Sequence, residues 1–183
     1  MAKAKTGAFY LTEQVILTNN LATQGTISLA SYIDVASKQG IAIEQVDFMY
    51  QSQTGAGAYS NSVEGINTLN TAWTATAQIT DVNRGVNVVS SADRALIGSG
   101  SLVHATTNGV SNVADVYPDN YGSVALDEAR IVVNDQLFFT AECDGDFAGS
   151  SNMPVTVRLK CRIVKLTERD FMAIAITSSA ADN

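Results

Sequence analysis

The sequence predicts an all-β protein, a single jelly-roll β-barrel or sandwich of about eight antiparallel strands. Apolar and polar residues alternate with a period of two along most of the chain, which is typical of strands with one buried face. Loops rich in Gly, Ser and Asn separate these runs, and helical patterns are short. Long loops such as Gln53–Asn70 favour a jelly roll over a tight meander. We expect residues 1–183 to form one domain, a size that buries roughly 70% of the surface of the unfolded chain.

The first half of the chain contains four alternating runs. An opening strand is expected over Phe9–Leu17 and a half-buried strand over Gly25–Val35. Within Ile41–Tyr50 the apolar positions change parity near Glu44–Gln45, which indicates either a β-bulge or a strand that changes faces. The fourth run is Trp73–Ile79.

The last third of the chain has the clearest pattern. Ala129–Glu142 is either one long strand or a hairpin that turns at Asn134–Asp135. Val155–Ile163 is the cleanest alternation in the chain, and Phe171–Ile176 is expected to be the closing strand. Two short segments are candidates for isolated helical turns: Ser91–Ile97, with Ser91 as its cap, and Asp127–Arg130.

Composition and charge exclude several classes of function. Only 16% of the residues are charged, whereas 54 are Ser, Thr, Asn or Gln, so much of the surface must be neutral and polar. The 11 basic and 18 acidic residues give a net charge of −7, which disfavours the coating of nucleic acid by general electrostatics. We expect no signal peptide, because the first residues contain no apolar run of the required length, and no apolar stretch approaches the length of a membrane span.

The cysteines and the histidine indicate structural roles. Cys143 and Cys161 are expected to be free, partly buried thiols, although a single disulfide remains open if their strands are neighbours. Cys161 shares the core-facing parity of its strand, whereas Cys143 borders a polar loop and should be more accessible. His104, the only histidine, fits a strand residue better than a base, and no serine has a G-x-S-x-G context. No catalytic residue and no cofactor is therefore predicted.

One acidic segment is a weak candidate for a metal site. Glu142, Asp144 and Asp146 alternate and could converge on Ca²⁺, although a solvated acidic loop is the preferred interpretation. The EF-hand pattern fails because Phe147 replaces its glycine and Met153 its bidentate glutamate.

Three cations share one face of the strand Val155–Ile163. Arg158, Lys160 and Arg162 alternate with the apolar residues. They form either a solvated sheet face or an interface that meets the acidic surface of a neighbouring subunit.

The segment RIVVNDQLFFTAECDGDFAGSSNMPVTVRLKCRIVKLTERDFMAIAIT, which starts at Arg130, resembles the closing strands of small single jelly-roll capsid proteins. The similarity is to the major capsid proteins of tailless icosahedral viruses with an internal membrane, the type that infects haloarchaea and Thermus. This resemblance implies an upright barrel in pseudo-hexameric capsomers of the virion, often beside a second, larger capsid protein. It also implies an internal lipid vesicle near the protein, which would separate it from the genome without any insertion of the protein, and hence no direct binding of nucleic acid.

The sequence therefore favours a self-assembling structural capsid protein with no catalysis. One alternative is a β-sandwich binding module of the adhesin, fibre or tail type, which would act as a monomer or trimer with exposed loops. The other is an enzyme on a β-sandwich, such as one that cleaves glycans. That enzyme would need a cleft with two carboxylates and several aromatic residues, and aromatic residues make up only 7% of the chain.

Overall fold

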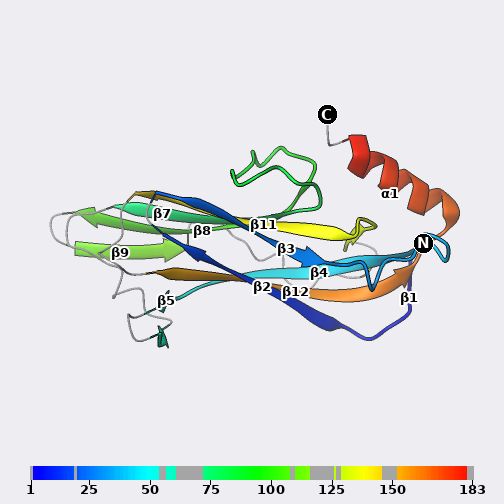
Figure 1. Cartoon of the computed structure of the whole chain (residues 1–183), viewed down its shortest axis with the longest axis horizontal. Coiled ribbons are helices and arrows are strands. Elements are labelled where there is room, and N and C mark those ends of the chain that lie inside the picture. Colours follow the sequence, from blue (N-terminus) through cyan, green and yellow to red (C-terminus); the bar gives the residue numbers. More distant parts are fainter. Residues whose placement is uncertain are drawn as a thin grey trace.

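The computed structural model is a sandwich of two antiparallel sheets stacked face to face (Figure 1). It describes residues 2–18, 20–53, 57–60, 72–107, 110–115, 126, 129–145 and 152–180. The first sheet contains, in spatial order, β2 (Phe9–Leu17), β12 (Met153–Lys165), β4 (Gln39–Tyr50) and β10 (Arg130–Val132). The second contains β3 (Ala22–Ser28), β11 (Gln136–Gly145), β7 (Trp73–Thr80), β8 (Leu96–Thr107) and β9 (Val110–Asp115).

The strand order identifies the fold as a jelly roll. When β9 is set aside, the eight main strands numbered along the chain have the order 1-8-3-6 in the first sheet and 2-7-4-5 in the second. All of these pairs are antiparallel, and this double Greek-key arrangement defines a jelly roll. The predicted fold class is therefore confirmed.

Three short strands complete the described structure. β1 (Lys3–Ala4) pairs with the end of β12, on the same side of that strand as β2. β5 (Ser52–Gln53) and β6 (Tyr59–Ser60) pair with each other. Most of the loop predicted over Gln53–Asn70 lies outside the described residues.

The core lies between the sheets and is supplied by alternate residues of each strand. In β12, Val155, Val157, Leu159 and Cys161 are fully buried, as the alternation predicted. Across the sandwich, the rings of Phe48 on β4 and Phe139 on β11 stack with centroids 6.2 Å apart. Apolar residues that are solvated in the unfolded chain are thereby removed from water, which supplies the main stabilisation of the fold.

The parity change in β4 is a β-bulge, one of the two predicted alternatives. Lys160 pairs with Gln45 but Cys161 pairs with Ile43, so Glu44 has no partner in the register. The extra residue lets Ile43 and Val46 both face the core on the two sides of the bulge.

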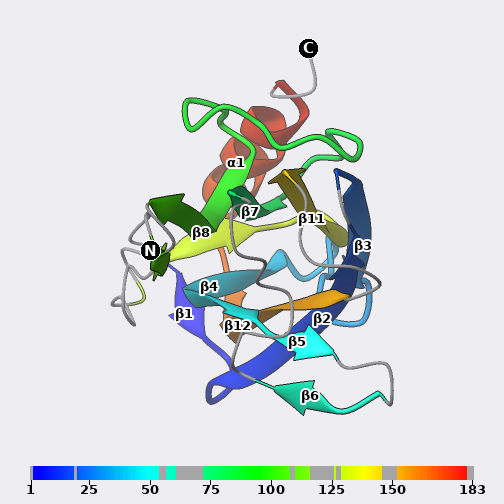
Figure 2. The ribbon, with the colours of Figure 1, turned by 90° about the vertical axis from the view of Figure 1, so that its left-hand side faces the viewer.

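The outer face of the second sheet is partly covered by the segment 82–95, which lies above β7 and β11 in Figures 1 and 2. The buried Gln78 amide holds this segment, because its Nε2 donates to the Val89 carbonyl at 2.9 Å and its Oε1 accepts from the Val89 amide at 2.6 Å. The Gln78 side chain thus replaces a neighbouring strand as hydrogen-bond partner of the Val89 main chain.

The chain over Phe171–Ile176 is helical, so the predicted closing strand is wrong. It belongs to α1 (Glu168–Ala180), which Thr167 caps by accepting a hydrogen bond from the Asp170 amide at 3.2 Å. Phe171 packs with Leu166, Ala42 and Val164 in a second, smaller cluster, which attaches α1 to the end of the first sheet. No helix among the described residues combines the length and the hydrophobicity needed to cross a bilayer.

Other boundaries also differ from the predictions. The strand expected over Gly25–Val35 ends at Ser28, because a turn starts at Leu29 and reverses the chain. The turn at Asn134–Asp135 exists, but β10 and β11 join different sheets, so neither a hairpin nor a single strand forms. Ser91–Ile97 forms turns followed by the start of β8, and Asp127–Arg130 lies partly outside the described residues and ends in β10.

Both cysteines are buried as free thiols, so the disulfide alternative is not adopted. Cys143 is only 2% exposed, which contradicts the expected accessibility; its side chain faces the core in line with Phe139 and Ala141. Burial, reinforced by the Glu44 carboxylate, raises the pKa of the Cys161 thiol to about 12.

The face assignment of β12 predicts very different costs for two neighbouring truncations. Leu159→Ala should lower the free energy of unfolding by about 2–5 kcal/mol, because it leaves a cavity in the core. Arg158→Ala, on the exposed side, should cost less than about 1 kcal/mol. Urea titration of both variants checks this, and equal losses would disprove the assignment.

The burial of both thiols predicts slow labelling of the native protein. A maleimide at about pH 8 should leave Cys143 and Cys161 largely unmodified, because reaction requires an accessible thiolate. Denaturation should then expose both. Peptide mass mapping distinguishes the sites, and rapid labelling of native Cys143 would contradict its burial.

Candidate functional site

The three predicted cations form a row on the outer face of the first sheet. We call Arg158, Lys160 and Arg162 the basic strip. They occupy alternate positions of β12, opposite the buried side chains of Val157, Leu159 and Cys161. The alternation therefore placed all three on the correct face.

Glu44 neutralises one end of the basic strip from within the same chain. Its carboxylate is 4% exposed, accepts a hydrogen bond from Arg162 Nε and lies 3.7 Å from Lys160 Nζ. The β-bulge produces this arrangement, because it adds one residue to β4 next to the two cations. The sequence marked Glu44 as a bulge residue but did not identify it as an ion-pair partner.

Arg158, at the other end of the strip, lies over an aromatic ring and is exposed. Its guanidinium lies over the Tyr10 ring, 4.1 Å from the centroid, and the side chain is exposed. Asp47 stands opposite it in the register, but the Asp47 carboxylate accepts hydrogen bonds from Gln45 Nε2 at 2.9 and 3.2 Å. Among the described residues, Arg158 makes no ion pair.

The opposite outer face, on the second sheet, carries two acidic residues at the edge of the segment 82–95. We call Glu142 and Asp144 on β11 the acidic pair. Their neighbours in the register on β7 are Thr76 and Thr74, and the Thr76 hydroxyl lies 3.1 Å from that of Ser101 on β8. Asp144 is exposed, whereas Glu142 is half-buried and accepts a 3.5 Å hydrogen bond from the Val88 amide.

The predicted calcium ligands remain untested as a set. Within the described part of the chain, no cluster of three or more His, Cys, Asp or Glu side chains is arranged to hold a metal ion. Asp146, the third member of the candidate set, lies outside the described residues.

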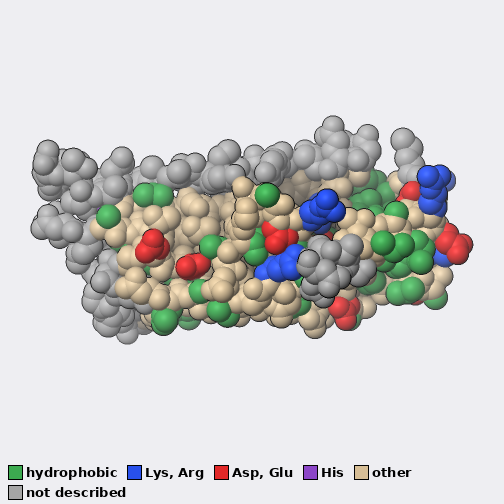
Figure 3. Space-filling view, turned by 90° about the horizontal axis from the view of Figure 1, so that it is seen from above, with side chains coloured by type: hydrophobic (Ala, Val, Ile, Leu, Met, Phe, Trp, Pro, Cys, Tyr) green, Lys and Arg blue, Asp and Glu red, His purple; other side chains and the backbone are tan. Residues whose placement is uncertain are grey.

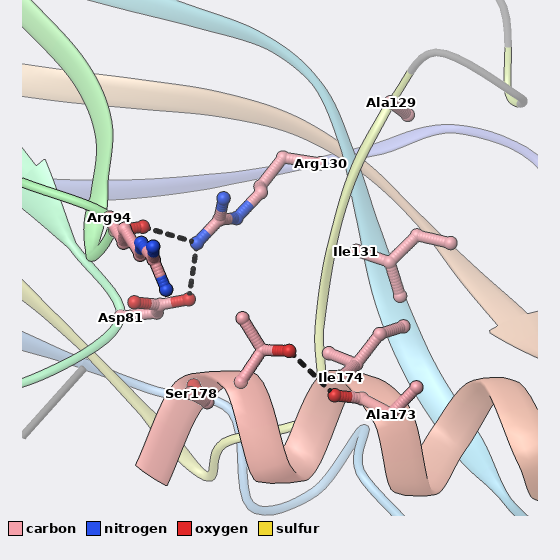
Figure 4. A pocket seen from close by; sticks show the side chains of 9 residues that line it. Asp81, Arg94, Ala129, Arg130, Ile131, Ala173, Ile174 and Ser178 are labelled. Carbon is pink, nitrogen blue, oxygen red and sulfur yellow. Dashed lines mark hydrogen bonds and ion pairs between the residues drawn. The ribbon is translucent and has the colours of Figure 1, made fainter. Parts of the chain in front are cut away.

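A cavity of about 510 Å³ lies between α1, β10 and the two residues Asp81 and Arg94, at the two ends of the segment 82–95 (Figure 4). At its edge Arg130 Nη2 donates to Asp81 Oδ2 and to the Arg94 carbonyl, both at 2.9 Å. Because β10 belongs to the first sheet and Asp81 follows β7, this ion pair links the two sheets. Asp81 is 5% exposed, so Arg130 compensates a buried charge.

The cavity lacks the constellation that glycan cleavage would need. Among the described residues that line it, Asp81 is the only carboxylate and none is aromatic. His104 is fully buried in β8, with its ring 5.4 Å from that of Trp73, so it has no access to a substrate. The prediction that His104 lies in a strand is confirmed.

The described surface is mostly neutral. In the view from above, acidic and basic side chains are scattered among other residues, and hydrophobic side chains gather at the end where α1 lies (Figure 3). Met172 and Ile176 of α1 are among the exposed large hydrophobic residues.

Comparison with known proteins yields resemblance at the level of structure alone. No protein-family model matches the sequence, and no curated protein does. A KI polyomavirus VP1 pentamer subunit aligns with 82% of this chain and 77% of its own, at 10% identity and a TM-score of 0.39. A decameric BFDV capsid protein aligns with 87% of this chain and 99% of its own, at 10% identity and a TM-score of 0.38. Desmodium yellow mottle tymovirus aligns with 88% of this chain and 90% of its own, at 8% identity and a TM-score of 0.30. The jelly-roll assignment rests on the strand order described above.

The buried position of Glu44 predicts that its charge stabilises the fold. Glu44→Gln should cost about 1–3 kcal/mol, because it removes a charge-assisted hydrogen bond and leaves two cations without compensation. Asp47→Asn is the matched control on the same strand and face, and should cost less than about 1 kcal/mol. Urea unfolding measures both, and a neutral Glu44→Gln would contradict the arrangement.

The link between the sheets makes a second prediction about stability. Arg130→Met should lower the free energy of unfolding by about 1–3 kcal/mol, because the Asp81 carboxylate loses its cation. In the double variant with Asp81→Asn, part of this loss should be recovered. A double-mutant cycle of thermal unfolding tests the coupling, and strictly additive effects would show that the two residues do not interact.

Proposed function

We propose that this chain is a structural capsid protein that assembles with further copies of itself into the shell of a virion. The observation that carries the proposal is the jelly-roll strand order, in which each of the two sheets has an outer face. Jelly rolls also occur in lectins and cupins, so the strand order does not by itself identify the function. The chemistry of the surface distinguishes among these possibilities.

The surface chemistry supports assembly in two ways. Neutral Ser, Thr, Asn and Gln side chains lose less solvation on contact than charged ones do. Arg158 carries a charge that the described residues do not pair, so a neighbouring subunit can supply its partner. The basic strip of Arg158, Lys160 and Arg162 is accordingly our proposed interface.

The finer features follow from the sequence resemblance and belong to the same proposal. They are an icosahedral shell over an internal membrane, a second capsid protein in the capsomer, a protein near the membrane without insertion, and no direct contact with nucleic acid. A single domain over residues 1–183 is also part of it, since the eight main strands already extend from Phe9 to Lys165.

The proposal predicts higher oligomers of the purified chain. Sedimentation velocity and negative-stain microscopy, at about 0.1 M and about 1 M salt, should show capsomers or shells, alone or with the other structural proteins of its virus. The two salt conditions change the Debye length from about 10 Å to about 3 Å and so show whether charge favours or opposes assembly.

A compact monomer or isolated trimer under every condition would instead support the β-sandwich binding module. That alternative predicts binding of glycans or receptors by the monomer or trimer itself, which a glycan array would detect.

A further inference from the structure

Charge is divided between the two sheets. The strands of the first sheet contain six cations, Lys3, Arg130, Arg158, Lys160, Arg162 and Lys165, and three acidic residues, Glu13, Glu44 and Asp47. The strands of the second sheet contain no Lys or Arg and three acidic residues, Asp115, Glu142 and Asp144. The strands of the two sheets therefore carry opposite net charge, while the segment 82–95 over the second sheet adds Arg84, Asp93 and Arg94.

The two outer faces carry exposed charges of opposite sign. On the first sheet, Glu44 compensates Arg162 and Lys160, while Arg158 remains exposed and without an ion pair among the described residues. On the second sheet, Asp144 is exposed at the end of β11. Each face thus presents an exposed charge, and the two charges are of opposite sign.

The surroundings of the acidic pair suit close contact. Thr74, Thr76 and Ser101 are short side chains on a regular sheet, and they lose little conformational freedom on docking. The segment 82–95, which Gln78 and Val89 hold over part of this face, reaches Glu142 through the Val88 amide, so Asp144 is the exposed member of the acidic pair.

We infer that the basic strip of one copy docks on the acidic pair of the next copy, with Arg158 directed at Asp144. This inference rests on the proposed capsid function and names the contact that assembly would use. Contact between two first-sheet faces would bring like charges together, which is costly, so the copies associate front to back. Such a heterologous contact closes into a ring when the rotation between copies permits.

Two charge reversals test the contact. Arg158→Glu and Asp144→Arg should each weaken association at least about tenfold, because each places like charges opposite one another. Asp135→Arg makes the same charge change as Asp144→Arg, but at the exposed turn before β11, and should associate as the wild type does. Circular dichroism checks that each variant is folded, and Arg158→Gln and Asp144→Asn provide milder substitutions with a smaller loss.

An equimolar mixture of the two reversed variants provides the decisive measurement. In a front-to-back contact, the carboxylate introduced by Arg158→Glu meets the guanidinium introduced by Asp144→Arg on the next copy. The other contact in the mixture pairs the Arg158 and Asp144 side chains that the two variants retain. Sedimentation of the mixture should therefore recover association that neither variant shows alone.

The outcomes separate this inference from the proposed function. If the wild type assembles and both reversals assemble equally well, or if the mixture fails to recover association, the contact is wrong and the capsid function stands. If the wild type does not assemble at any concentration, either alone or with the other structural proteins of its virus, both the contact and the assembly function are overturned.

Discussion

The structure depends on the pairing of β12 along both of its edges. β2 pairs with Met153–Cys161 on one side, and β4 pairs with Val155–Lys165 on the other. With both edges paired, the strand cannot rotate or slip, because a shift of one residue would exchange its buried and outer rows. The same constraint that buries Leu159 therefore fixes Arg158 on the outer face and sets the position from which it can reach another molecule.

Local alternation predicted the strands well wherever burial of one face decides the structure. It located β2, β4, β7 and β12, and the parity change at Glu44 marked a real bulge. It could not assign β10 and β11 to different sheets, because their partners lie far away in the chain. It also missed α1, since Phe171, Ile174 and Ile176 are residues that favour strands; Thr167 and the acidic residues after it were the available helix signals.

The candidate site was predicted only in part, again because residues that pair can lie far apart in the chain. The face of the three cations followed from period two, whereas the pairing of Glu44 with Arg162 joins residues 118 positions apart. The sequence could have predicted the burial of Cys143, because this residue continues the inward row of Leu137, Phe139 and Ala141. Its position beside a polar loop outweighed that pattern in the prediction, although β11 extends beyond Cys143 to Gly145.

The neighbouring positions of β2 and β12 also bear on how the chain is made. β2 is the first of the eight main strands to leave the ribosome, yet its partner over Met153–Cys161 belongs to the last of them. The first sheet therefore cannot close until the final main strand has been made, and until then the apolar residues of β2 and β4 lack their central neighbour. Pairing of such distant segments also makes folding slow. A newly made subunit thus passes through a period in which its strand edges are open to other nascent chains, and this period ends only when β12 inserts between β2 and β4.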